Sequence, residues 1–410
     1  MELKSKSKQK EKTQLVDLGS VTRWLSGGTP SRSIEEYWFG DIPWISASTL
    51  RTIEIFESDK CVTAEAVAVG SKMAPVGATL LLVRGSALHN EILAGLVTKP
   101  VCFNQDVKAL VPSHNVFPKF LTYSLLGHET QLLKLVSSAG NTAGVLDTKL
   151  VQALRIWVPP KAEQSAIATA LSDVDALLAG LDKLIAKKCD IKQTTMQQLL
   201  ACKTRLPGFA GKWETRLLGE VAEVKTGPFG SSLHERDYVL EGTPIITVEH
   251  LGERGIDHRN LPMVSDTDKQ RLKAYSLHVG DIVFSRVGSI DRNALIRDPE
   301  AGWLFSGRLL RVRPQKSIIS AHFLSYQFHG EVFKSNVRNV AVGQTMASLN
   351  TKILSYLPVT LPSIDEQAAI ATVLGDMDTE IAALEQRREK TRLLRQGIMQ
   401  ELLTGRTRLV

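Results

Sequence analysis

Two short loops carry the residues whose chemistry is easiest to interpret. Arg84-Gly85-Ser86 follows one predicted strand, and Arg286-Val287-Gly288-Ser289 follows another. A guanidinium group suits phosphate oxygens and the acceptor edge of guanine, so these loops are the best candidates for contact with DNA. Together with polar residues of neighbouring loops, the predicted DNA-contacting set is Arg32, Arg84, Ser86, Ser231, Ser232, Arg286, Ser289 and Arg292.

A glycine-rich loop stands near the start of each half of the chain. The first spans 26–32 and the second spans 226–232. Backbone amides and hydroxyls in such loops suit phosphates and base edges. Each loop is equally compatible with an ordinary turn beside core aromatic residues, and Trp38 and Trp44 are more typical of a core than of base contacts.

The motifs of several enzyme classes are missing. The chain has no GxxxxGK[ST] loop and no GxGxxG after a strand, and its histidines form no HxH or HExxH pair. Glu223-Val224-Lys225 has the ExK spacing of many nucleases, but no aspartate lies close upstream to complete a metal site. We therefore expect a chain that is not an enzyme, with no catalytic residues, no metal and no cofactor of its own.

Composition sets looser bounds. The net charge of +7 fits an anionic partner without requiring one. The four cysteines show no CxxC spacing, as expected for reduced cytosolic thiols. No apolar run approaches the ~18–20 residues of a membrane helix, and the lysine-rich residues 1–12 suggest a disordered tail rather than a signal peptide. We expect a cytoplasmic protein with no membrane partner.

The elements that position these loops are repeated. Residues 159–206 align without a gap to 362–409 at an offset of 203, with 21 of 48 positions identical. Upstream of each copy the same register links Phe120 to Phe323 and Gly140-x-Thr142 to Gly343-x-Thr345, whereas the fronts of the two halves diverge. A repeat of this length has to be interpreted before any other feature. It indicates one scaffold with two different faces.

The repeated segments have a helical pattern. Apolar residues recur every 3.5 positions from Ile167 to Ile185 and from Ile370 to Leu384, which predicts a narrow coiled-coil seam in both copies. Beyond the seam we expect Ile191, Leu199, Leu200, Leu394, Ile398, Leu402 and Leu403 to continue the apolar face. A single helix over residues 163–201 would be about 58 Å long at ~1.5 Å per residue. The alternative is two unrelated surface helices on separate domains.

Connectivity favours antiparallel helices. Residues 207–359 leave the end of the first helix and must enter the start of the second, and these two ends are neighbours only if the helices run antiparallel. The fold expected is α+β: two pseudo-twofold-related α+β domains separated by an antiparallel coiled coil of two long helices. The predicted boundaries are a tail at 1–12, domains at 13–156 and 207–359, and helical spacers at 157–206 and 360–410.

Within the two domains, short apolar runs predict buried strands at 78–83, 107–111, 281–285 and 309–312. Residues 117–126 and 321–328 have helical patterns. The strands do not alternate with helices as in βαβ units, which favours an α+β domain.

The repeat resembles a known family. Leu361-Pro362-Ser363-Ile364-Asp365-Glu366-Gln367 and Leu402-Leu403-Thr404-Gly405-Arg406-Thr407-Arg408-Leu409 look like the conserved region of type I restriction–modification specificity subunits, and residues 159–206 look like its partner copy. The loops at 27–46 and 226–232 resemble the openings of two target-recognition domains. The resemblance covers nearly the whole chain. One departure is Ala201-Cys202-Lys203, where the second copy has Thr404-Gly405-Arg406.

The resemblance implies a non-catalytic reader of double-stranded DNA. Each target-recognition domain would read one half of a bipartite, asymmetric site, and the helices would fix the gap. Two methyltransferase subunits with S-adenosylmethionine and two restriction/translocase subunits with ATP and Mg would complete a cytoplasmic, nucleoid-associated bacterial or archaeal complex. The residues expected to dock the methyltransferases are Glu163, Gln164, Gln197, Glu366, Gln367 and Gln400.

Two other hypotheses stay open. One is a pseudo-symmetric coiled-coil scaffold without sequence-specific DNA binding. The other is an intrinsic DNA-modifying enzyme, which requires that the chain alone transfer methyl groups or cut DNA.

Overall fold

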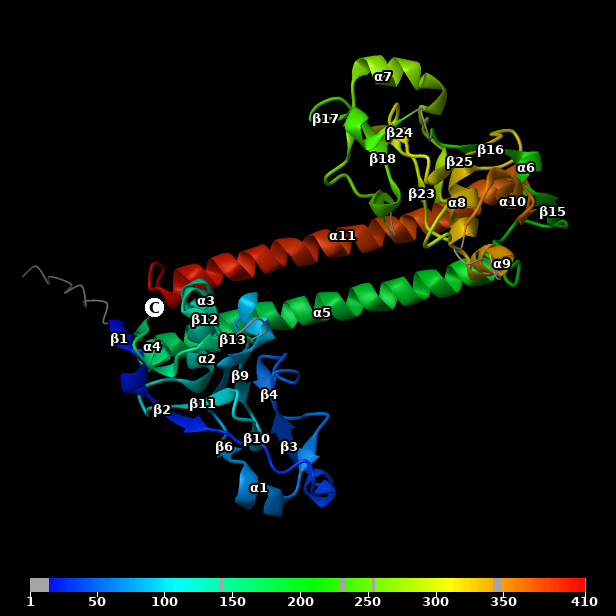
Figure 1. The fold of residues 1–410 in the computed structure, drawn as a ribbon. Coiled ribbons are helices and arrows are strands. Elements are labelled where there is room, and N and C mark those ends of the chain that lie inside the picture. The colour runs from blue at the N-terminus through cyan, green and yellow to red at the C-terminus, as the bar shows by residue number, and fades with distance from the viewer. Residues whose placement is uncertain (1–14, 140–142, 229–232, 253–254, 342–347, 410) are drawn as a thin grey trace, which may run out of the picture. The chain divides into compact units, whose positions relative to one another are not determined.

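The computed structural model describes residues 15–139, 143–228, 233–252, 255–341 and 348–409. The chain divides into two compact units (Figure 1). The first unit combines residues Met1–Asp182 with Gln386–Val410, and the second is Lys183–Glu385. Each unit therefore contains one α+β body and a part of both long helices.

A five-stranded sheet forms the centre of the first unit. Its order is β2 (Thr22–Ser26), β11 (Val107–Pro112), β7 (Thr79–Leu82), β9 (Ala94–Val97) and β4 (Glu54–Ile55). Strand β4 is parallel to β9, and the other neighbours are antiparallel. All four residues of β7 are buried, as the apolar run predicted. The remaining elements of this body are β1 (Leu15–Asp17), β3 (Ile42–Ile45), β5 (Cys61–Val62), α1 (Ala64–Gly70), β6 (Met73–Ala74), β8 (Arg84–Gly85), β10 (Val101–Phe103), α2 (Pro118–Gly127), α3 (Glu129–Lys134), β12 (Val136–Ala139), β13 (Ala143–Leu146), α4 (Thr148–Gln152) and β14 (Arg155–Trp157).

The second unit has a related sheet of four strands. Its order is β16 (Ala222–Thr226), β25 (Leu309–Pro314), β22 (Ile282–Ser285) and β23 (Asn293–Leu295). No described strand lies beyond β23 in this sheet, at the place that β4 occupies in the first. The remaining elements of this body are β15 (Glu214–Leu217), α6 (Leu218–Val221), β17 (Tyr238–Val239), β18 (Thr243–Ile246), β19 (Leu251–Gly252), β20 (Gly255–Ile256), β21 (Met263–Val264), α7 (Asp266–Arg271), β24 (Leu304–Phe305), α8 (Ala321–His329), α9 (Glu331–Ala341), α10 (Thr351–Ser355) and β26 (Pro358–Leu361).

Two helices of equal length carry the repeat. They are α5 (Lys161–Leu200) and α11 (Ile364–Leu403), both labelled in Figure 1. The predicted seam is buried or half-buried in both copies; Ile167, Leu171, Ile370 and Leu374 are at most 1% exposed. In the first unit this seam packs against α2 through Phe120.

Ion pairs show the direction of the helices within each unit. In the first unit α5 residues Asp175 and Asp182 pair with α11 residues Arg395 and Arg388. In the second unit Lys188 and Lys192 pair with Glu380 and Asp378. In both, the residue number rises along one helix as it falls along the other. The antiparallel prediction is thus confirmed within each unit.

The predicted continuation of the apolar face is partly wrong. Leu199, Leu402 and Leu403 are buried. Ile191 and Leu394, which are equivalent at the offset of 203, are 41% and 60% exposed. The 3.5-residue spacing of the seam is lost after Ile185, so these two positions rotate away from the packed face.

The smaller elements agree with the sequence patterns. The predicted strands appear as β7, β11, β22 and β25, and the two predicted helices appear as α2 and α8. The α+β class is confirmed.

Candidate nucleic-acid interface

In the first unit, the predicted arginine loop is held by a second repeated segment. Strand β8 pairs antiparallel with β13, placing Arg84 opposite Val145. Strand β13 belongs to the segment after Gly140-x-Thr142, so the fold brings together two motifs that the sequence showed only separately. Arg84 and Ser86 are exposed at this edge.

The second unit repeats this pairing with a different arginine position. Val287 bridges Ser348, which is the counterpart of Val145. Val287 is therefore the structural equivalent of Arg84, and Arg286 lies one position earlier. Successive residues of an extended strand point to opposite faces. The two arginines consequently have different surroundings.

Arg286 is half-buried, and its guanidinium group hydrogen-bonds to backbone carbonyls. Its Nε donates to the carbonyl of Leu349 at 3.2 Å and its Nη1 to the carbonyl of Gly307 at 3.4 Å. Ser289 and Arg292 are exposed further along the same loop, and an Arg292 guanidinium nitrogen donates to the carbonyl of Leu251. Direct DNA contact by these residues stays a prediction.

The glycine-rich loops have a packing reason for their glycines. A Cβ on Gly27 would lie 2.2 Å from the carbonyl oxygen of Phe103, and one on Gly227 would lie 2.1 Å from that of Ser306. Trp44 is 2% exposed and its indole donates to the carbonyl of Gly28 at 3.2 Å, as expected of a core aromatic. Exposed Arg32 follows in this loop; Ser231 and Ser232 lie outside the described residues.

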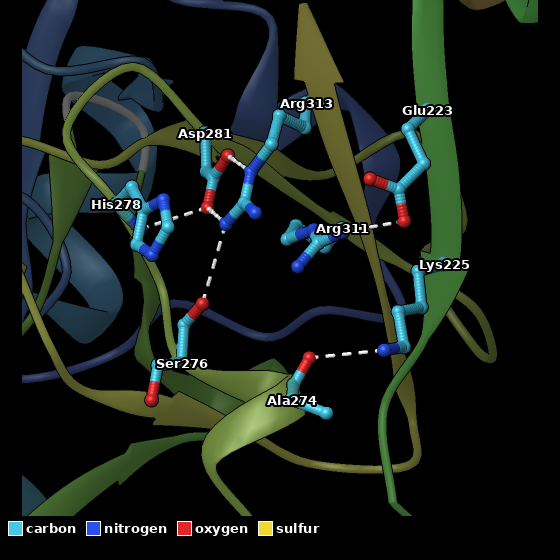
Figure 2. Close-up of polar contacts among 8 residues, drawn as sticks. All are labelled: Glu223, Lys225, Ala274, Ser276, His278, Asp281, Arg311 and Arg313. Carbon is cyan, nitrogen blue, oxygen red and sulfur yellow. Dashed lines mark hydrogen bonds and ion pairs between the residues drawn. The ribbon is translucent and has the colours of Figure 1, made fainter.

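A charged cluster on the second sheet was not foreseen from the sequence. Figure 2 shows Arg311 and Arg313, which alternate on β25 and face Glu223 on β16 and Asp281. Arg313 binds both carboxylate oxygens of Asp281 at 2.7 Å, and Arg311 binds Glu223 at 2.8 Å. Burial, and then the charge of Arg313, lower the pKa of Arg311. The Arg311 and Asp281 side chains are 3% and 1% exposed, whereas the Glu223 side chain is 59% exposed and stays in water.

This cluster also binds the segment 274–276 through hydrogen bonds to its backbone. The Arg313 guanidinium also donates to the carbonyl of Ser276, and the Lys225 ammonium donates to the carbonyl of Ala274 at 3.0 Å (Figure 2). Both residues of the nuclease-like ExK spacing are thus in internal contacts. On the second sheet Lys225 lies opposite Arg311; the equivalent positions on the first sheet are apolar, with Leu25 opposite Ala109. Within the described ranges, no group of three or more His, Cys, Asp or Glu is placed to hold a metal ion.

The predicted docking residues at the helix starts are buried. Glu163 and Glu366 are 1% exposed. Arg408 binds Glu163 through two bonds of 2.6 and 2.7 Å, and Arg205 binds Glu366 in the same bidentate manner, with its Nε at 2.8 Å. These pairs are equivalent at the repeat offset. Each ties the end of one repeat to the start of the other.

The side chains of the neighbouring glutamines hydrogen-bond to backbone groups. The Gln164 amide accepts from the N–H of Phe117 at 2.7 Å and donates to the carbonyls of Asn115 and Pro159. Gln367 makes the equivalent three bonds to Ser320, Ile318 and Pro362. The side chains of these two glutamates and two glutamines are therefore all hydrogen-bonded within their own units. Gln197 and Gln400 are exposed.

A third pair of equivalent contacts lies along the helices. The Tyr123 hydroxyl donates to Asp175 at 2.7 Å, and Tyr326 donates to Asp378 at 2.8 Å. Burial, together with the neighbouring carboxylate, raises the pKa of each tyrosine. Both phenols therefore stay protonated and keep donating at neutral pH.

Comparison with known proteins identifies the scaffold. The family profile described as type I restriction modification DNA specificity domain matches residues 8–188 and 210–394. The EcoR124I/EcoR124II specificity subunit of Escherichia coli is 29% identical over 178 residues, which span 43% of this chain and 44% of that protein. The MjaVIII specificity subunit of Methanocaldococcus jannaschii is 23% identical over 97% of this chain and 94% of its own length.

Solved structures agree on the fold. The S subunit of a type I system from M. genitalium has a TM-score of 0.59 at 16% identity, covering 97% of this chain and 98% of its own. A chain from a structure concerning assembly and conformational transition of the type I system has a TM-score of 0.57 at 17% identity, covering 96% and 98%. In the described residues no helix is long and apolar enough to cross a membrane. Because the family profile covers most of both repeats, this chain belongs to the type I restriction–modification DNA specificity subunits.

Proposed function

We propose that this chain reads a bipartite, asymmetric DNA site, one half with each α+β body, and is itself non-catalytic. The observation that carries the proposal is the contrast between the two kinds of contact. The helix contacts recur at the offset of 203, whereas the residues around the loops differ between the units. A repeated scaffold with different fronts suits one task performed on two different half-sites.

The loop surfaces support direct readout. Arg84 and Ser86 in the first body, and Ser289 and Arg292 in the second, are exposed beside the paired β8–β13 and Val287–Ser348 segments. Arginine can discriminate guanine through a bidentate contact, whereas other cations supply salt-dependent affinity without sequence preference.

The exposed faces of the helices support partner docking. Ile191 and Leu394 are exposed at equivalent positions, as are Gln197 and Gln400. Two equal surfaces suit two copies of one partner. We propose that each binds an adenine-N6 methyltransferase subunit, through which the restriction subunits join, and that the paired helices set the gap between half-sites. The methyltransferase would carry S-adenosylmethionine, and the restriction subunit ATP and Mg.

Expression of this chain with its cognate methyltransferase subunit tests the DNA proposal. Long-read sequencing of the modified DNA is expected to show one bipartite motif with methyladenine on each strand. An assembled complex that produces no motif would refute it in favour of a scaffold without DNA specificity. Methyl transfer or DNA cleavage by the purified chain alone would refute its non-catalytic role.

Native mass spectrometry tests the docking surface. Leu394→Asp should remove one methyltransferase subunit from the complex, and adding Ile191→Asp should remove both. Leu240→Asp is the matched control because Leu240 is 98% exposed and stands between β17 and β18 rather than on α5 or α11. Full stoichiometry in the double variant would exclude these positions from the docking surface.

A further inference from the structure

A groove of about 800 Å³, lined by both charged and apolar residues, opens in the second unit. It lies where helices α8 and α9 and strand β23 meet the parts of α5 and α11 that belong to this unit. Six basic or imidazole side chains line it: Lys192, Arg292, Arg297, His322, His329 and Lys334.

In the first unit, the side chains of Lys119 and Glu54 occupy the equivalent place. The Lys119 ammonium reaches the hydroxyl of Ser172 at 2.9 Å and the carboxylate of Glu54 on β4 at 2.9 Å. At the repeat offset the counterparts of Lys119 and Ser172 are His322 and Gly375, both of which line the groove. Among the described residues, the groove thus coincides with the lack of a sheet strand beyond β23 and with two substitutions. It is a difference between the halves, not a feature of the shared scaffold.

The charges in the groove are unbalanced. Its carboxylates are already paired: Asp378 binds Lys192 at 2.6 Å and Asp291 binds Arg338 at 3.5 Å. The Lys334 ammonium has no hydrogen bond or ion pair with any described residue. Burial lowers the pKa of His329. The Lys334 and Lys192 charges also lower this pKa, whereas the Ser325 carbonyl and Asp378 raise it.

A buried polar atom adds an independent observation. Asn293 lines the groove and is 2% exposed, yet its Oδ1 has no partner among the described residues. Its Nδ2 donates to the carbonyl of Asp291 at 3.4 Å, so Asn293 marks an unsatisfied acceptor in the groove wall and does not itself offer a donor to phosphate. Arg292 precedes it and belongs to the loop that begins at Arg286. The groove is thus continuous with the proposed DNA-reading loop.

We propose that this groove binds a phosphate of the DNA backbone beside the second half-site. The proposal rests on the proposed function. The chemistry offered is that of ammonium, guanidinium and imidazole donors, which suit phosphate oxygens but carry no sequence information. Continuity with the Arg286–Arg292 loop favours DNA over an acidic peptide. Because the first unit has the place filled, this contact is made on one side of the bipartite site only.

Two variants of the complete methyltransferase complex test the proposal. Lys334→Gln removes the ammonium that has no hydrogen-bond or ion-pair partner among the described residues. Gly375→Leu fills part of the groove without adding a charge, and a Cβ at 375 would meet only the Tyr326 hydroxyl, at 3.7 Å, among the described residues. Lys316→Gln is the matched control. Lys316 is exposed in the turn after β25, so this variant removes the same charge outside the groove.

The measurement is binding to duplex DNA with and without the motif, titrated with salt. One lost phosphate contact should make the slope of log affinity against log salt shallower by about 0.9. The affinity ratio of wild type to variant should then shrink about 3.5-fold between roughly 50 and 200 mM salt. Both groove variants should show this on either duplex, with an unchanged methylation motif, and the control should not.

Each other outcome is decisive. An unchanged slope in both groove variants, with a wild-type complex that still prefers its motif, overturns the groove proposal and leaves the proposed function standing. A wild-type complex without motif preference overturns the function instead. If inorganic phosphate, AMP or polyglutamate binds by calorimetry and loses binding in the variants while the DNA slope stays unchanged, the groove serves that ligand and the DNA proposal is overturned.

Discussion

The ion pair between Glu163 and Arg408 offers the sharpest test of how the repeat holds the fold together. Glu163 is 1% exposed, and Arg408 reaches it with two guanidinium nitrogens while lying 5.4 Å from the centroid of the Trp157 ring. We consider Arg408→Met, which keeps an apolar stem against the indole and removes the charge. The carboxylate of Glu163 then has no cation to bind.

The magnitude follows from the exposure of the two partners. Breaking a fully buried pair costs about 3–5 kcal/mol, and breaking an exposed one costs about 0–1 kcal/mol. The Arg408 side chain is 41% exposed, so water can replace part of the lost contact. We expect a loss of about 2 kcal/mol, between those limits. For a unit of about 200 residues this corresponds to a drop of about 4–8 °C in Tm.

Two measurements check this value. Calorimetry gives the change in Tm, and hydrogen exchange reports local opening at the start of α5, expected to rise by a factor of about 30. Arg406→Met is the control, because Arg406 is 61% exposed and stands two residues away in the same tail. Replacing both Glu163 and Arg408 by methionine should recover most of the loss, because the unpaired buried charge is gone.

Two results would refute the reasoning. If Arg408→Met is no more destabilising than Arg406→Met, water alone satisfies the Glu163 carboxylate. If the double methionine variant is as unstable as Arg408→Met, packing rather than charge accounts for the loss. Arg205→Met should have the same effect at the start of α11 because Arg205 binds Glu366 equivalently.

Three further predictions concern the scaffold and the reading loop. Gln164→Ala should cost about 2–3 kcal/mol in urea unfolding because the Phe117 N–H and two carbonyls lose their partner, and a loss below about 0.5 kcal/mol would mean that water replaces the amide. Inserting ~4 residues, about one turn or ~6 Å, after Lys187 should lengthen the gap in the methylation motif without changing either half-site; changed half-sites with an unchanged gap would contradict the proposed spacing role. Arg286→Ala should relax one half-site in methylome sequencing. Equal loss on all DNA would instead identify a phosphate contact or a loss of the tether to Leu349.

The sequence was most predictive where structure depends on local periodicity. The seam that includes Ile167 and Leu171 required only the spacing of apolar residues, and the structure buries both. The antiparallel direction followed from connectivity. Ile191 and Leu394 were misassigned because an apolar residue near a fading heptad satisfies the same pattern whether it faces a helix or solvent.

The polar residues were harder to interpret. Glu163 and Gln164 are residue types common at an exposed helix start. In the structure Glu163 is bound by Arg408, 245 residues away, and Gln164 by an irregular loop that includes Asn115. One signal was available: Glu163, Gln164 and Arg205 all recur at the same offset as Glu366, Gln367 and Arg408. Coincident repetition of an acid and a base is consistent with a reciprocal pair, but sequence spacing alone gives no distance. The unequal placement of Arg84 and Arg286 required strand register, which the sequence does not specify.

Reciprocity explains why the scaffold is duplicated more faithfully than the fronts. Arg205 of the first copy binds Glu366 of the second, and Arg408 of the second binds Glu163 of the first. Lys192 and Arg395 cross between copies in the same way to reach Asp378 and Asp175. A change in either copy therefore removes a partner from the other, so each unit constrains the sequence of both copies. Arg84 in its loop and Lys334 in the groove take part in no such crossed pair among the described residues, and such positions can diverge within one half at no cost to the other.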